Sequence, residues 1–81
     1  MTEHLTQADL DREAAHFARA AARSGAAATD AARAAADPTN SPTTRACAPR
    51  AGETARRNAA EYRHIAAELR AGEIPDGVDL S

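Results

Sequence analysis

The chain has 81 residues, a formal net charge of −2 and one cysteine. We expect a chain of this length to form one domain at most, and a single cysteine excludes an intramolecular disulfide framework. Alanine makes up most of its hydrophobic residues, and it has one Phe, one Tyr and no Trp, so a large apolar core is excluded as well. Alanine is the best helix former, and the composition therefore predicts helices with thin packing.

The first predicted element is a helix over about residues 7–36. Thr6 is its expected N-cap, and Asp9 stands three residues later, where a capping-box acid belongs. Gly25 weakens the pattern, so we expect a break or kink at residues 25–29, with one continuous helix as the alternative. A narrow stripe of mostly small side chains follows at spacings of three and four: Leu10, Ala14, Phe17, Ala21, Ser24 and Ala28.

Residues 37–51 are predicted to form a loop. They contain three of the four prolines, together with several Thr, Ser and Asn residues. Asp37 precedes Pro38, and a residue before proline is pushed out of the α region, so the first helix should end there. Such a length is unusual for a connection in a compact domain, which indicates either a binding segment or plain disorder.

The second predicted helix covers about residues 53–71. Gly72 suits the position after its end, and Pro75 prevents continuation. The acidic tail 72–81 carries three spaced apolar residues and is either a short docking segment or a frayed terminus. The apolar stripe of this helix consists of Ala55, Ala59, Tyr62, Ala66 and Leu69, with Ile65 on its flank.

These elements predict an all-α fold, a helical hairpin whose two stripes pack on each other. Bulky apolar side chains are too few for the hairpin to be stable alone, so a second surface is expected to complete it. That surface would belong to another protein chain, in a homo-oligomer or as a subunit of a hetero-complex. The Ala-rich stretch is interrupted by charges, and no membrane association is expected. A lone cysteine, Cys47, fits a reducing, cytoplasmic location.

Two Glu-x-x-His pairs raise the possibility of metal binding. Glu13 with His16, and Glu61 with His64, each place a carboxylate and an imidazole one helical turn apart, as in di-iron bundles. At 100° per residue, however, both histidines and Glu61 lie well away from the apolar stripes. We therefore expect solvated polar faces, and no metal or other cofactor.

A cluster of arginines offers a second alternative, contact with nucleic acid. Arg45, Arg50, Arg56 and Arg57 make this stretch locally basic. The overall charge is negative and no aromatic side chains lie between the arginines, so nucleic-acid binding is not favoured. Cys47 within the stretch is interpreted as an incidental loop thiol, with an intermolecular disulfide as the alternative.

The sequence favours an interaction protein over an enzyme. It has no glycine-rich phosphate loop and no nucleophile–base spacing, and we expect no catalytic residues. The expected function is that of an accessory subunit or modulator of a larger complex. Partner contact is predicted through the largest side chains of the two stripes: Leu10, Phe17, Tyr62, Ile65 and Leu69.

Overall fold

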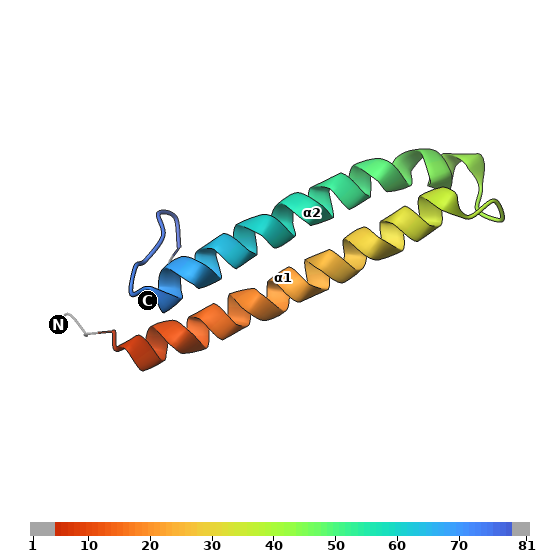
Figure 1. Ribbon diagram of the computed structural model, residues 1–81. Coiled ribbons are helices and arrows are strands. Elements are labelled where there is room, and N and C mark those ends of the chain that lie inside the picture. Colours follow the sequence, from red (N-terminus) through yellow and green to blue (C-terminus); the bar gives the residue numbers. More distant parts are fainter. Residues whose placement is uncertain (1–4, 79–81) are drawn as a thin grey trace.

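The computed structural model describes residues 5–78 and contains two long antiparallel helices (Figure 1). Helix α1 spans Gln7–Ala36 and helix α2 spans Pro42–Arg70. They form a single-layered rod of 57 × 18 × 16 Å, in which the two helices pack along their length. The predicted all-α helical hairpin is therefore confirmed.

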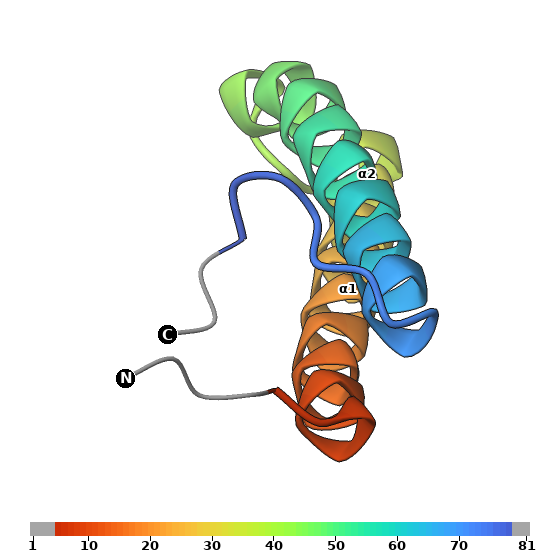
Figure 2. The same ribbon diagram turned by 90° about the vertical axis from the view of Figure 1, so that its left-hand side faces the viewer.

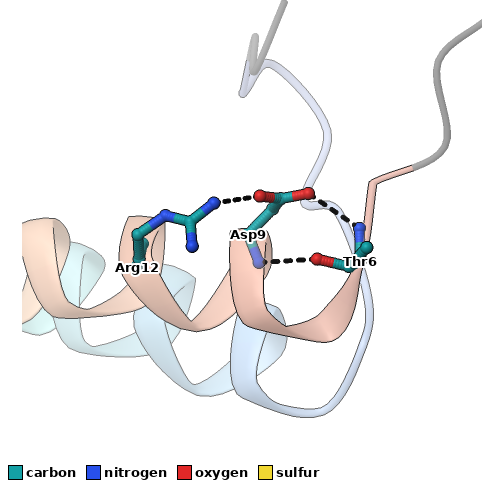
Figure 3. A network of polar contacts seen from close by, with 3 residues as sticks. All are labelled: Thr6, Asp9 and Arg12. Atoms are coloured by element: carbon teal, nitrogen blue, oxygen red, sulfur yellow. Dashed lines mark hydrogen bonds and ion pairs between the residues drawn. The ribbon is translucent and has the colours of Figure 1, made fainter.

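Helix α1 begins at the predicted capping box. The Thr6 hydroxyl accepts a hydrogen bond from the Asp9 backbone N–H (3.1 Å), and the Asp9 carboxylate accepts one from the Thr6 N–H (2.9 Å; Figure 3). Arg12 also contacts this carboxylate. Hydrogen bonding to the ionised form, first from the Thr6 backbone and then from its hydroxyl, lowers the pKa of Asp9 below its ordinary value.

The expected break at residues 25–29 is wrong, because α1 is continuous through Gly25. This glycine has ordinary helical geometry without a positive φ. The buried stripe continues on both sides of it, through Ala21 and Ala28. Packing of that stripe against α2 offsets the roughly 1 kcal/mol that a helical glycine costs relative to alanine.

The predicted loop at 37–51 is also wrong in extent, since α2 begins at Pro42. Ser41 is the N-cap, and its side chain accepts a hydrogen bond from the Thr44 N–H (3.1 Å). Pro42 occupies the first helical position. A backbone N–H there would have no partner within the helix, so the N–H that proline lacks costs no hydrogen bond. The prolines that predicted a loop thus include one that starts the helix.

The true connection is five residues long, from Asp37 to Ser41. Asp37 accepts hydrogen bonds from the Thr39 hydroxyl (2.6 Å) and the Thr39 N–H (2.9 Å), which lower the pKa of the Asp37 carboxyl. The Asn40 side-chain amide donates to the Ala34 carbonyl at the end of α1 (3.0 Å). These local bonds turn the chain sharply enough for the second helix to return along the first.

Pro49 lies inside α2, seven residues after its start. A proline there has no N–H to donate to the carbonyl of residue 45, so one helical hydrogen bond is lost. The flanking Ala48 and Gly52 are buried against α1. Their packing keeps this turn helical although the proline alone predicts a boundary.

The seam between the helices consists mainly of alanine. Eight described apolar residues are buried: Leu10, Ala14, Ala21, Ala28, Ala48, Ala59, Ala66 and Leu69. Successive members are four or seven residues apart on α1, and eleven, seven and three residues apart on α2, which keeps them on one face of each helix. A Cβ added at Gly52 would lie 3.2 Å from the Ala31 Cβ, so the backbones approach closely near the loop.

The end of α2 is fastened to the start of α1. Gly72 has a φ of +86°, and the Glu73 N–H bonds the Glu68 carbonyl (2.9 Å), as in a Schellman motif. The Gln7 side-chain amide donates to the Leu69 carbonyl (3.1 Å). The predicted termination at Gly72 is confirmed. The tail then folds back beside α2 (Figure 2), and its residues 79–81, Leu80 among them, lie outside the described residues.

Candidate protein-binding interface

Two of the five predicted contact residues are used inside the hairpin. Leu10 is 6% exposed and Leu69 is fully buried, and with Ala14 and Ala66 they form one core cluster. Both leucines are therefore covered within the hairpin. Their contribution is to hold α1 and α2 together at the open end of the rod.

The other three predicted contact residues are half-buried and neighbouring, and we call them the aromatic patch: Phe17, Tyr62 and Ile65. The ring centroids of Phe17 and Tyr62 are 6.1 Å apart with the ring planes inclined by 37°. Phe17 and Ile65 also pack against the core cluster. The patch therefore continues the core outwards, and part of each side chain remains accessible to a second surface.

The acidic tail borders the aromatic patch. A hollow of about 380 Å³ lies between α2 and the tail, lined by Ile65 and His64 on one side and by Ile74, Pro75 and Asp76 on the other. Ile74 is 51% exposed, although it is a large apolar residue. The tail thus adds apolar area next to the patch without covering it.

A second groove follows the other side of the hairpin. Two adjoining hollows of about 400 and 490 Å³ lie between the helices and share Arg63. Arg56 lines the first hollow and Arg70 the second. We call these three side chains the arginine edge. The lining residues that α1 contributes are small and include Ala18, Ala22, Gly25, Thr29 and Ala32. We call the two hollows together the arginine groove.

The residues proposed for metal binding are not brought together. His16 is exposed and makes an edge contact with Phe17, with ring centroids 5.6 Å apart. His64 Nε2 lies 2.6 Å from a Glu68 carboxylate oxygen instead of pairing with Glu61. Within residues 5–78, no group of three or more His, Cys, Asp or Glu side chains could hold a metal ion. Glu13 belongs to α1 and joins no such group.

The arginines proposed for nucleic-acid contact all lie on α2, since the loop predicted to hold the first two is helical. Arg45, Arg50, Arg56 and Arg57 are exposed. Of the four, only Arg56 lines a described groove. At 100° per residue, Arg45 and Arg56 share one side of the helix and Arg50 and Arg57 share another, about 120° away, so the four form no single flat basic face.

Cys47 is exposed on the first turns of α2. It lines a mostly apolar hollow with Ala31, Ala34 and Ala51 near the loop. Because the predicted loop is helical here, Cys47 lies on a helix surface and not in an irregular segment.

Sequence reasoning missed the arginine groove. Arg63 and Arg70 were not among the predicted site residues, and Gly25 was considered only as a helix breaker. The usable signal was the seven-residue spacing of the arginine edge, which places all three side chains on one flank of a helix. Which flank faces α1 depends on the register of the hairpin.

Comparisons with known proteins assign neither a family nor a function to this chain. No family model matches the chain, and neither the curated proteins nor the solved structures include a match. Neither helix in the described part of the chain combines the length and apolar character needed to cross a bilayer.

Proposed function

We propose that this chain is a small non-enzymatic interaction protein, an accessory subunit or modulator that packs its hairpin against another protein chain. The observation that carries the proposal is the single-layered fold with an almost purely alanine seam. Of the eight buried apolar residues described, only Leu10 and Leu69 are larger than alanine. Alanine burial removes little apolar area from water, so a second surface would add much of the missing stabilisation.

The aromatic patch is the surface we assign to this contact. Aromatic side chains are enriched at the centres of protein interfaces because they bury a large area at low entropic cost. Phe17 and Tyr62 are the chain's only Phe and Tyr, and they meet across the two helices. Ile65 and the exposed Ile74 extend the apolar area beside them.

Sedimentation across a wide range of protein concentrations, followed together with circular dichroism, tests this proposal. We expect self-association that Ile65→Asp reduces, because a carboxylate in the patch would lose its hydration on burial. Ala46→Asp, at an exposed site on the same helix, is the matched control and should associate like the unmodified chain. A monomer at all concentrations that melts cooperatively at high temperature would contradict the need for a second surface.

A further inference from the structure

We propose that the arginine groove binds an acidic helix from a different protein, one whose carboxylates recur every seven residues. This inference rests on the proposed interaction function and names a partner chemistry for it. The groove is separate from the aromatic patch, because Arg63 and Ile65 are about 200° apart around the axis of α2.

The arginine edge has the periodicity of a helix-binding surface. Arg56, Arg63 and Arg70 are seven residues apart, which places them about 10 Å from one another along α2. A second helix lying along the groove would present side chains of every seventh residue at the same interval. Carboxylates at that spacing could meet all three guanidinium groups at once.

Among residues 5–78, no ion pair joins the arginine edge to a carboxylate of the hairpin. Positions that flank a helix–helix seam commonly carry opposite charges on the two helices. Here α1 contributes Ala18, Gly25 and Ala32, at the same seven-residue interval, to the groove. The ion pairs found among residues 5–78 join Asp9 to Arg12, Asp30 to Arg33 and Glu68 to His64, and none of them includes the arginine edge.

Gly25 gives an independent indication of a close approach. Gly52 is explained within the hairpin, because a Cβ there would lie only 3.2 Å from the Ala31 side chain. A Cβ at Gly25 would meet nothing within 4 Å, and its φ is not positive. Neither space nor backbone geometry within the described chain requires glycine at this lining position of the groove, although glycine there costs roughly 1 kcal/mol. A second helix packed over it would supply the reason.

The charges favour a different protein over a second copy of this chain. A symmetric pair formed through this face would bring one arginine edge near the other, which is repulsive. The acids of α2 that share a seven-residue spacing, Glu61 and Glu68, belong to the tail side, where they line the hollow beside Ile74. They cannot occupy the groove of a partner in that symmetric arrangement.

The lining favours a helix over nucleic acid. The arginines stand on one edge only, and the α1 side of the groove is formed by small, uncharged residues. Such a surface allows helix backbones to come close, whereas single-stranded nucleic acid is bound by aromatic side chains that stack on its bases. No aromatic residue lines either hollow.

Fluorescence anisotropy with the intact chain and two synthetic peptides tests the proposal. The first probe is a labelled four-heptad helix of Ala and Leu with Glu at every seventh position. The second has Gln in place of each Glu. We expect the Glu peptide to bind about tenfold more tightly, which corresponds to about 1.4 kcal/mol shared among three exposed ion pairs.

Variants locate the site. Arg56→Gln combined with Arg63→Gln should reduce the preference for the Glu peptide to about twofold or less. The matched control, Arg50→Gln combined with Arg57→Gln, removes the same charge outside the described groove and should retain the preference. Gly25→Leu should abolish binding by filling the groove, while circular dichroism shows that the hairpin remains helical.

Several results would overturn the inference. These are failure of the Glu peptide to bind, equal affinity for both peptides, and equal loss of preference in the control variant. If the Arg56 and Arg63 changes instead abolish self-association or retention on single-stranded DNA, the occupant is a second copy or nucleic acid. If both peptides bind equally and Ile65→Asp abolishes their binding, the groove is wrong but the proposed interaction function stands.

Discussion

The open end and the loop end of the hairpin share one seam but are held together differently. At the open end, the buried side chains include Leu10 and Leu69, with Phe17 and Ile65 packed against them. At the loop end, the buried residues are Ala28, Ala48 and Gly52, and no larger apolar side chain is present among them. One end is stabilised by the area of its side chains, and the other by the closeness of its backbones.

Because of this difference, the two ends should respond oppositely to a change in side-chain volume. Removing atoms leaves a cavity where the side chains are large, and adding atoms separates the helices where they are small. The ends are also fastened by similar local devices, an N-cap at Thr6 and another at Ser41. The contribution of side-chain volume to stability can therefore be tested separately from that of the hydrogen bonds at the helix ends.

The largest effect is expected from Leu69→Ala at the open end. Leu69 is fully buried in the core cluster, and such a truncation typically lowers the free energy of unfolding by about 2–5 kcal/mol. Urea denaturation followed by circular dichroism at 222 nm measures it. Leu5→Ala is the matched control, because Leu5 is 45% exposed and should cost far less. Equal effects of the two changes would show that the open end is not held by side-chain area.

The next largest effect is expected from Gly52→Val at the loop end. Even a Cβ at this position would lie 3.2 Å from that of Ala31, so the two further methyl groups of valine must push α1 and α2 apart. Overpacking of this kind costs about 1–3 kcal/mol. Ala60→Val, at an exposed position of α2, controls for the lower helix propensity of valine. A Gly52→Val chain as stable as this control would contradict the close approach.

A smaller effect with the opposite sign is expected from Gly25→Ala. Gly25 has open space for a Cβ, so the substitution should stabilise the isolated hairpin by about 0.5–1 kcal/mol through helix propensity. Gly52→Ala raises the helix propensity by the same amount, but the Ala31 side chain must move to make room for the new Cβ. The free energy of unfolding should therefore increase less than for Gly25→Ala. Thermal melts of the two variants side by side make the comparison. A greater gain at Gly52 would show that the loop end is not tightly packed.

The smallest effect is expected from acid, which weakens the hydrogen bonds of a carboxylate at each end of the hairpin. The pKa of Asp9 at the open end and that of Asp37 at the loop end are both lowered from the ordinary value of 3.8. A lowered pKa in the folded state stabilises the fold above pH 3.8, and this contribution is lost as the pH falls through the folded-state pKa values. Stability measured from pH 6 to pH 2 should decline in that window.

Asp9→Asn and Asp37→Asn should each flatten part of the acid decline. Asp11→Asn is a suitable control in the first turns of α1, since Asp11 accepts its hydrogen bond from the Gln7 side chain rather than from the capping residue. If the pH dependence of stability is unchanged in both variants, these carboxylates do not stabilise the two ends.

Much of the fold could be predicted because its signals are local or periodic. The Thr6–Asp9 box and the Gly72 terminator act within a few residues, and both stand where the sequence predicted them. The stripes around Ala21 and Ala66 also proved to be the buried faces. Two errors arose at Gly25 and Pro49, where local propensity favours a break but packing between the helices outweighs it. The third arose at Pro42, which starts a helix after the Ser41 cap although it was interpreted as part of a loop.

The candidate surfaces were less predictable than the fold. Partner contact was assigned by side-chain size, which selects the core as readily as a surface, and Leu10 and Leu69 belong to the core. Size alone cannot distinguish the two, since burial depends on which residues of the other helix lie opposite. The aromatic patch was predicted from the same criterion, whereas the arginine groove needed the register of α1 against α2.

The amino-acid pattern alone predicts two helices, the Thr6 cap, the end at Gly72 and the side of each helix that is buried, because these depend on spacing and on neighbours in the chain. The Ser41 cap is an equally local signal, but the surrounding prolines concealed it. Packing between the helices was needed to show that α1 continues through Gly25, that α2 stays helical through Pro49, and that the arginine edge faces small residues of α1. The physical reason is that packing between residues distant in the chain offsets local costs of about 1–3 kcal/mol. It also sets which side chains meet, and therefore which surfaces remain for a partner.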